Sequence, residues 1–176
     1  MKQYLKTGSI LIGLLTLLTG VVYPLVVTGL AQLCFTAKAN GSLITDYKNN
    51  KVVGSILIGQ TFSKPEYFWG RPIREALPPS SPLLVKSVGD RINDLHRYEP
   101  VALIPNDLLF TSASMVDPHI SPQAAFYQVK RIASIRHLPE DTINTLIYKL
   151  TLNRTIGILG EPRINVVQLN YALDTL

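Results

Sequence analysis

The sequence predicts a mixed α/β (α+β) domain carried by one N-terminal transmembrane helix. Three observations lead to this fold class. No charged residue occurs in the 31 positions between Lys6 and Lys38, a stretch long enough to cross a bilayer as a helix. The whole chain is 47% hydrophobic and only 16% charged, fewer charges than the roughly 25% of an average soluble domain. The remaining positions alternate between strand-like and helix-like patterns.

Length and composition exclude several classes of protein. A chain of 176 residues has room for one domain, or a small domain plus an anchor, and not for a large multidomain enzyme. The single cysteine, Cys34, excludes an intrachain disulfide framework and a cysteine-based zinc site. The high hydrophobic content excludes a chain that is disordered throughout.

The predicted transmembrane span runs from Ile10 to Leu33 and reads ILIGLLTLLTGVVYPLVVTGLAQL. Lipid offers no hydrogen-bond partners, so this span must be helical, and Pro24 is expected to kink it or to be accommodated by a local distortion. A cleaved signal peptide is the alternative, but its apolar region is only about 7–15 residues long. We therefore predict an uncleaved anchor over residues 1–35 and a domain over residues 36–176.

The placement of charge bears on orientation and on partners. Lys2 and Lys6 precede the span, which favours a cytoplasmic N-terminus only slightly, because basic residues also follow the span. Residues 36–176 hold 15 Lys or Arg and 12 Asp or Glu, a net charge of +3. Because this charge is small and scattered, it does not indicate a nucleic-acid partner.

In the first half of the domain, β-prone runs, turn residues and one helical spacing define the expected elements. The predicted elements are a hairpin of strands 42–46 and 51–58 around a turn at 47–50, a loop over 75–87, a helix over 88–98, and strands over 101–104 and 108–111.

The second half is predicted to be mainly helical. A Ser-Pro pair, typical of a helix start, opens a helix over about 121–137. A second helix begins at 139–141, where two carboxylates suit the positive end of the helix dipole. Asn165 is expected to cap the last helix, and a short strand is predicted over 155–159.

Residues 111–121, TSASMVDPHIS, bring Ser, Asp and His together, so a hydrolase with Ser112 or Ser114 as nucleophile is considered. Residues this close in sequence rarely converge as a catalytic triad requires. We favour a small-residue loop that holds structure or a partner, with Asp117 capping a turn. The sequence has no P-loop, no Asp-Lys-Thr-Gly phosphorylation motif and no G-x-S-x-G elbow, and its histidines lack metal-site spacing.

A second candidate region combines GSILIGQTF with the aromatic run YFWGRP. Aromatic side chains beside Arg71 are typical of an interaction surface. The competing interpretation is a core strand, a buried aromatic cluster and a tight turn. We favour the core, because aromatic residues supply much of the apolar bulk that a small domain needs.

Read in order, these segments resemble the C subunit of the Kdp-type potassium-transporting ATPase. The resemblance runs nearly end to end and rests on VYPLVVTGLAQLCF, GSILIGQTF, YFWGRP, TSASMVDPHISPQAAFYQVKRIA and LGEPRINVVQLNYALDTL. One stretch, within residues 73–90, departs from the family. After Gly-Arg-Pro the family has Ser-Ala and a Gly/Ser/Asn-rich segment, whereas this chain reads IREALPPSSPLL. Any role of that loop in relatives therefore does not carry over.

The resemblance implies a non-catalytic accessory subunit of a high-affinity, ATP-driven potassium uptake complex. Its partners would be the potassium-translocating A subunit, the ATP-hydrolysing B subunit, the small F peptide and membrane lipid. The family's C subunit crosses the bacterial plasma (inner) membrane once, with a cytoplasmic N-terminus and an extracytoplasmic (periplasmic) domain beside the A subunit. The family's C subunit is described as a catalytic chaperone that raises the ATP affinity of the B subunit. A domain outside the cell cannot reach cytoplasmic ATP, so we expect assembly and stabilisation, with ATP contacted only through the complex.

Motif membership singles out candidate residues for contact with a partner or ligand, with no catalytic residue, metal ligand or bound cofactor among them. These residues are Gly54, Gln60, Arg71, Ser112, Ser114, Asp117 and His119. A stand-alone, membrane-anchored extracytoplasmic binding module is the alternative function, with residues 112–119 as its only local candidate site.

Overall fold

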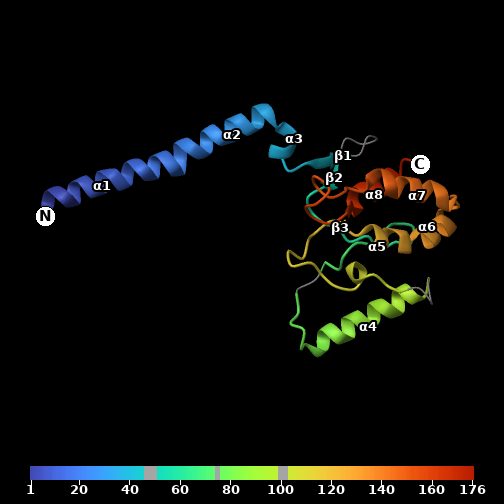
Figure 1. Cartoon of the computed structure of the whole chain (residues 1–176). Helices are drawn as coiled ribbons and strands as arrows, with labels where there is room; N and C mark the ends of the chain where they lie inside the picture. Colours follow the sequence, from blue (N-terminus) through green and yellow to red (C-terminus); the bar gives the residue numbers. More distant parts are fainter. Residues whose placement is uncertain (46–50, 74–75, 99–102) are drawn as a thin grey trace. The chain divides into compact units, whose positions relative to one another are not determined.

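The structure is a computed structural model that describes residues 1–45, 51–73, 76–98 and 103–176 (Figure 1). The chain forms two compact units, Met1–Leu43 and Ile44–Leu176. The predicted hairpin turn at 47–50 and part of the predicted strand at 101–104 lie outside the described residues.

The first unit is almost entirely helical. Helix α1 (Lys2–Leu17) passes through a π-helical turn (Leu18–Val22) into helix α2 (Tyr23–Cys34), and the short helix α3 (Thr36–Ala39) follows. Together, Lys2–Cys34 form 33 residues with a mean hydropathy of 2.4 in their most apolar window. At 1.5 Å per residue the helix is about 50 Å long. By length and composition it can cross a membrane, and the predicted span lies within it.

Pro24 is accommodated by the π-helical turn that precedes it. A proline inside an α-helix lacks the N–H donor, and its ring clashes with the carbonyl group four residues earlier, here that of Gly20. The wider turn at Leu18–Val22 contains this glycine, and widened turns of this kind relieve such clashes. The helix therefore continues through Pro24 with a local distortion, as predicted.

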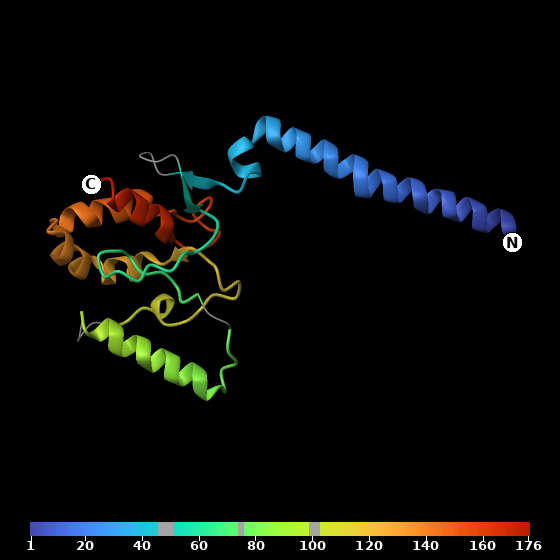
Figure 2. The same ribbon diagram turned by 180° about the vertical axis from the view of Figure 1, so that it is seen from behind.

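The second unit combines helices with two small sheets, which confirms the mixed fold class (Figures 1 and 2). Strand β1 pairs with β2, and β3 pairs antiparallel with β4. Helices α5 to α8 gather on one side of the unit, whereas α4 runs along the opposite side. The bounds are β1 Leu43–Thr45, β2 Val52–Ser55, α4 Pro82–His96, the 3₁₀ turn η2 Asn106–Leu108, β3 His119–Ile120, α5 Pro122–Tyr127, α6 Val129–Arg136, α7 Glu140–Leu150, β4 Ile164–Asn165 and α8 Val166–Leu173.

One hydrophobic core joins these elements. It draws on every helix of the second unit and on the aromatic run, because each helix turns one apolar face inward. Its fully buried members are Phe68, Ala124, Ala125, Ile132, Ile143, Ile147, Ile164 and Leu169. The burial of Phe68 confirms the core interpretation of that aromatic residue.

Both predicted helix caps are confirmed. The Ser121 hydroxyl accepts a hydrogen bond from the Ala124 N–H at 3.2 Å. The Asn165 side chain accepts bonds from the N–H groups of Val167 and Gln168 at 3.0 and 3.1 Å. Each cap satisfies amide donors that the first helical turn leaves without an internal partner.

Two helix boundaries differ from the prediction. Helix α4 begins at Pro82, six residues before the predicted start, because a proline fits the first helical position and Ser81 precedes it in an extended conformation. The predicted helix over 121–137 is broken at Gln128. There the Gln128 N–H donates a hydrogen bond to the Ala125 carbonyl. The Gln128 side-chain amide donates to the Ala124 carbonyl at 3.0 Å.

Two predicted strands are wrong. Leu108 ends the 3₁₀ turn η2 and residues 109–111 lie in a loop, and the Leu108 carbonyl accepts a bond from Arg91 Nε at 2.7 Å. Residues 155–159 form a tight turn closed by one bridge between Thr155 and Leu159. The positive φ angles of Ile156 and Gly157, 57° and 76°, reverse the chain there and prevent an extended strand.

Candidate functional site

Gly54 and Gln60, two of the predicted contact residues, lie against each other. The Gln60 side-chain amide folds back over the β2 strand and donates a hydrogen bond to the Val53 carbonyl at 3.0 Å. This amide occupies the space that a Cβ atom on residue 54 would need. A side chain at position 54 would therefore have to displace the flexible end of Gln60 and break its bond to Val53.

Arg71 joins two segments of the domain. Its Nη2 atom lies 2.5 Å from Asp107 Oδ1, and its Nε atom donates to the His119 carbonyl at 3.2 Å. The second oxygen of Asp107 accepts a bond from the Ser121 N–H at 2.7 Å, at the start of α5. Arg71 and Asp107 are both largely removed from solvent, where charge-assisted bonds are stronger than at the surface.

The remaining predicted residues form a network inside the 112–119 loop. The Ser112 and Ser114 hydroxyls lie 3.3 Å apart, and Ser112 Oγ accepts a weak bond from the Asp117 N–H at 3.4 Å. Asp117 Oδ1 accepts a bond from the His119 N–H at 3.0 Å and lies 2.9 Å from His119 Nδ1. The predicted turn cap by Asp117 is thus confirmed.

This geometry does not assemble the triad that was considered. A triad requires the serine hydroxyl to hydrogen-bond to the imidazole that activates it. Within the described part of the chain, neither Ser112 nor Ser114 is bonded to the His119 ring. The described residues also contain no group of three His, Cys, Asp or Glu side chains placed to hold a metal ion.

Gly59 brings these groups together. Its N–H donates to the Val116 carbonyl at 2.6 Å, so the 55–60 turn lies directly on the 112–119 loop. A Cβ atom at position 59 would lie 3.0 Å from the carbonyl oxygens of Val116 and Asp117. Because of this approach, Gln60, Arg71 and Asp117 line one small hollow.

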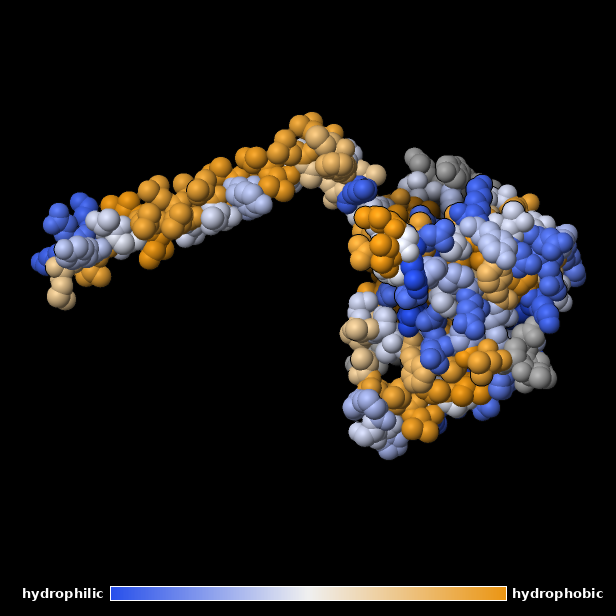
Figure 3. Space-filling view, viewed as in Figure 1, coloured by the Kyte–Doolittle hydropathy of each residue, from blue (hydrophilic) through white to orange (hydrophobic). Residues whose placement is uncertain are grey.

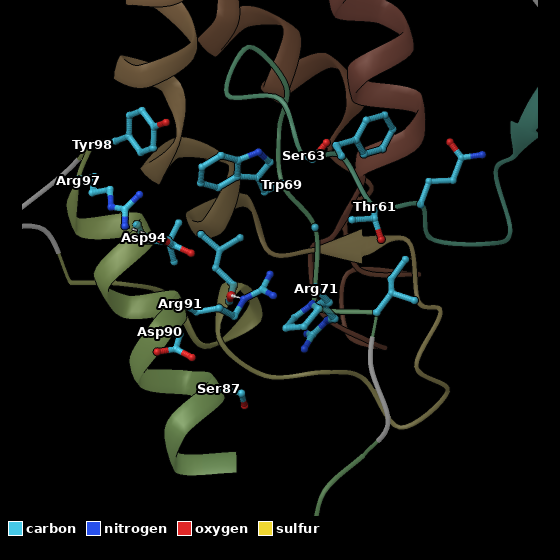
Figure 4. A pocket seen from close by; sticks show the side chains of 17 residues that line it. Thr61, Ser63, Trp69, Arg71, Ser87, Asp90, Arg91, Asp94, Arg97 and Tyr98 are labelled. Carbon is cyan, nitrogen blue, oxygen red and sulfur yellow. Dashed lines mark hydrogen bonds and ion pairs between the residues drawn. The ribbon is translucent and has the colours of Figure 1, made fainter. Parts of the chain in front are cut away.

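A cavity of about 480 Å³ lies between α4 and the segment that carries Trp69 and Arg71 (Figure 4). Asp90 and Asp94 on α4 and Arg97 just after it line one side. The Tyr98 and Trp69 rings meet in a T-shaped arrangement at a centroid distance of 5.7 Å. Arg97 pairs with Asp94 at 3.3 Å. The walls of the cavity therefore carry both positive and negative side chains, and they do not select an anionic or a cationic ligand.

Two side chains that the sequence did not single out hold the aromatic run in place. The Asn170 side-chain amide accepts from the Phe68 N–H at 2.8 Å and donates to the Phe68 carbonyl at 2.9 Å. Gln128 makes the same pair of bonds with Trp69, at 2.8 and 3.0 Å. Both amides are buried, and we call this pair the amide clamp. Its signal in the sequence is a polar residue in each apolar helical stripe.

Arg131 completes the support of the aromatic run. Its guanidinium lies 3.9 Å from the centroid of the Trp69 ring, donates to Gln128 Oε1 at 2.6 Å and also donates to the Pro65 carbonyl. Burial lowers the pKa of Arg131 to about 10, so this side chain is charged at neutral pH. A cation over an aromatic face gains energy when it is shielded from water.

Tyr67 and Arg136 fix the neighbouring turn. The Tyr67 hydroxyl donates to Asp174 Oδ2 at 3.0 Å, and Arg136 pairs with Asp174 Oδ1 at 2.6 Å. Burial, followed by the hydrogen bond to Asp174, raises the pKa of Tyr67 above 10.0. The C-terminal end of α8 is therefore tied to the start of the aromatic run.

Comparison with known proteins identifies the family. The family model described as K⁺-transporting ATPase, c chain, matches residues 5–175. The potassium-transporting ATPase KdpC subunit of Dechloromonas aromatica (strain RCB) is 48% identical over 191 residues, which cover 100% of this chain and 99% of the relative. The chain belongs to the KdpC family.

Other KdpC relatives match over the same extent. The KdpC subunits of Polaromonas naphthalenivorans (strain CJ2) and Methylococcus capsulatus (strain ATCC 33009 / NCIMB 11132 / Bath) are 46% and 43% identical. Each alignment covers 100% of this chain, and it covers 96% and 100% of the respective relatives. The resemblance that the motifs indicated is confirmed along the whole chain.

In this KdpC chain the motif residues are joined by contacts between distant segments. The amide clamp links the motif YFWGRP to the motifs that contain Gln128 and Asn170. Arg71, in the same motif, bonds to the 112–119 loop. One physical reason for these residue types is therefore the packing of the domain. Of the seven predicted contact residues, Ser114 is the one on the exposed side of the loop, in the exposed 113–116 stretch.

The close approach at Gly59 gives a testable prediction. The Gly59→Ala substitution is expected to lower the free energy of unfolding by about 1–3 kcal/mol, because an added methyl group meets two carbonyl oxygens that cannot move independently.

Gly89→Ala is the matched control. A Cβ atom at position 89 has nothing within 4 Å, and alanine is favoured over glycine inside a helix such as α4 by about 1 kcal/mol. Urea unfolding of the detergent-solubilised chain, followed by fluorescence of its single tryptophan, measures both. Equal stability of the two variants would contradict the close approach.

Proposed function

We propose that this protein is the C subunit of a bacterial, ATP-driven, high-affinity potassium uptake complex. The observation that carries the proposal is the extent of the family match. The alignment covers 100% of this chain and 99% of a relative named as a potassium-transporting ATPase KdpC subunit. A match that includes both the apolar helix and the domain supports the same role for the whole chain rather than for a shared module.

Within this proposal, residues 1–35 anchor the protein in the plasma membrane. Helix Lys2–Cys34 has no buried residue in its apolar window, so its aliphatic side chains are free to meet lipid or another membrane helix. We place the N-terminus in the cytoplasm, next to Lys2 and Lys6, and the 36–176 domain on the extracytoplasmic side. Basic residues before the span support this orientation.

The partners of the subunit are the A, B and F subunits of the complex, and its role is to assemble and stabilise them. We propose no catalytic step for this chain. The Ser112, Asp117 and His119 groups bond within their own loop, and Arg71 pairs with Asp107. Of the predicted contact residues, Ser114 is exposed and is the one best placed to reach a partner.

An effect on ATP affinity fits this arrangement only if it is transmitted through the complex. A domain on the extracytoplasmic side has no access to the nucleotide on the B subunit. Contacts of the domain and of the anchor with membrane-embedded subunits would instead bias the conformation in which the B subunit binds ATP. This is the form in which we propose the catalytic chaperone role.

Growth of a deletion strain in potassium-limited medium tests the function. Deletion of the gene for this chain is expected to abolish high-affinity potassium uptake. The full-length chain supplied in trans is expected to restore uptake and to copurify with the other subunits. A chain lacking residues 2–34 is expected to restore neither. Normal uptake in the deletion strain, or ligand-dependent activity of the chain without the other subunits, would contradict the proposal and favour a stand-alone binding module.

A further inference from the structure

A turn at one end of the second unit exposes an unusual group of aliphatic side chains. The turn spans residues 152–163, between α7 and β4, and we call it the aliphatic tip. Ile156, Ile158 and Leu159 are 84%, 78% and 63% exposed, and Leu152 at its base is about half exposed. Water-exposed aliphatic groups of this size are costly unless they meet an apolar surface.

The aliphatic tip is a defined structure rather than a loose loop. At its base, Leu152 and Arg163 exchange two backbone hydrogen bonds of 2.9 and 3.0 Å, and above it Thr155 and Leu159 exchange two more, of 2.8 and 3.0 Å. At its end, Ile156 has a φ of 57°, a conformation that β-branched residues rarely adopt and that favours glycine or asparagine. Folding alone therefore does not account for an isoleucine at this position.

The aliphatic tip emerges where the chain enters the domain. Asn165, two residues after the tip, donates to the Ile56 carbonyl at 2.6 Å, directly after β2. Strand β2 pairs with β1, the strand that receives the chain from the N-terminal unit. Leu57 and Ile58, next to this contact, are also more than half exposed. Figure 3 shows hydrophobic atoms gathered on this side of the domain, where the 152–163 turn lies in Figure 1.

The length of the connection limits how far this side can be from a bilayer. Nine residues, 35–43, separate the end of α2 from Ile44. Even a fully extended connection of this length spans only about 30 Å, and the short helix α3 reduces that reach. If the long helix is the membrane anchor, as in the proposed function on which this inference rests, the entry side of the domain stays close to the lipid headgroups.

The chemistry of the aliphatic tip fits lipid better than a protein surface. A stable protein interface buries about 800 Å² on each partner and is enriched in Trp, Tyr and Arg anchors. The tip is a narrow turn with three aliphatic side chains at its end, a fourth, Leu152, at its base, and no aromatic residue. Arg154 and Arg163 belong to the same turn and flank its three exposed aliphatic side chains, with Arg154 held 3.3 Å from Glu161. Basic residues near a membrane surface are attracted to anionic headgroups.

We propose that the aliphatic tip enters the boundary between lipid headgroups and acyl chains, and so gives the domain a second contact with the membrane beside its helix. Ile156, Ile158 and Leu159 lose their contact with water there, and Arg154 and Arg163 remain at the level of the headgroups. This contact restricts the rotation of the domain about its connection. It thereby presents one fixed face of the domain to membrane-embedded partners.

The test uses the full-length chain in vesicles of neutral and anionic phospholipids that carry a nitroxide on the acyl chain near the headgroup. In a Cys34→Ser background, Asn153→Cys places an environment-sensitive fluorophore on the turn without removing an aliphatic residue. Val85→Cys, an exposed position on α4, carries the same fluorophore as the matched control. We expect blue-shifted, strongly quenched emission at position 153 and unquenched emission at position 85.

A variant of the tip separates lipid contact from folding. Asparagine tolerates the positive φ at position 156, and the side chain at position 158 is exposed to solvent. The Ile156→Asn, Ile158→Ser double variant is therefore expected to unfold at the wild-type temperature. Removal of the two side chains is expected to shift the inserted-to-free equilibrium of the tip by about tenfold for each, with loss of most of the quenching. Equal quenching at positions 153 and 85, or quenching that the double variant retains, overturns the lipid contact.

Three outcomes distinguish a failure of the lipid contact from a failure of the membrane anchor. Shielding of position 153 that occurs only after the other subunits are added would show a protein partner and would overturn the lipid contact. Failure of the chain to float with the vesicles would overturn the membrane anchor itself, and with it the proposed topology. Flotation with an unquenched tip overturns the lipid contact alone.

Discussion

Replacement of Asn170 by leucine is expected to lower the free energy of unfolding of the domain by about 2–5 kcal/mol. The substitution removes both hydrogen bonds to Phe68 and leaves a buried N–H and a buried carbonyl without partners. Each unsatisfied group of this kind costs about 1–3 kcal/mol. Phe68 is fully buried, so water cannot replace the lost bonds unless the core opens.

Gln168→Leu is the matched control for this prediction. Gln168 lies on the same helix, α8, but is exposed. Its substitution also replaces a side-chain amide by leucine, and it leaves the amide clamp intact. Urea unfolding of the detergent-solubilised chain, read from the fluorescence of Trp69, compares the two variants. Trp69 adjoins the clamp, so its emission should also shift in the folded Asn170→Leu protein. If Asn170→Leu unfolds at the same urea concentration as Gln168→Leu, the amide clamp does not stabilise the domain.

The second large effect is expected at Arg71. The Arg71→Met substitution is predicted to lower the free energy of unfolding by about 2–4 kcal/mol, because it leaves the largely buried carboxylate of Asp107 without its cation. Asp107 stays bonded to the Ser121 N–H, so the start of α5 should survive while the 112–119 loop loses its tie to Arg71.

A double-mutant cycle with Asp107→Asn isolates the ion pair. The second substitution is expected to recover part of the loss in Arg71→Met, because a neutral amide at position 107 no longer needs a cation, and the two changes should not be additive. Arg154→Met, which breaks an exposed pair with Glu161, is the control and should cost less than about 1 kcal/mol. Additive effects at positions 71 and 107 would show that the pair has no stabilising role.

These two predictions depend on contacts that local sequence patterns do not encode. The bonds of the amide clamp join residues 59 and 102 positions apart. Residue propensity and hydrophobic periodicity describe neighbours within one helix or strand. They therefore placed Asn170 correctly on the last helix, α8, but gave no reason for an amide at that position. The same limit explains the wrong strand at 108–111, where Leu108 and Leu109 pack on the hydrophobic core without a neighbouring strand.

In the Ser112–His119 loop, too, the sequence predicted the local geometry but not the contacts with distant segments. The sequence indicated a small-residue loop with a turn capped by Asp117, and this local geometry is present. The sequence did not indicate that Gly59 packs its backbone against Val116, or that Arg71 and Asp107 fix the end of the loop. These contacts bring Gln60, Arg71 and Asp117 to one hollow, although 57 positions separate the first from the last.

The sequence by itself determined the apolar span, the helix starts at Ser121, at 139–141 and at Asn165, and the family. Each of these follows from residues close together in the chain, or from motifs that occur in a fixed order. Only the tertiary structure decided where the buried amides, the Arg71–Asp107 pair and the aliphatic tip lie. Their partners come from distant segments, and a polar group buried in the core must find a partner there, because water is excluded.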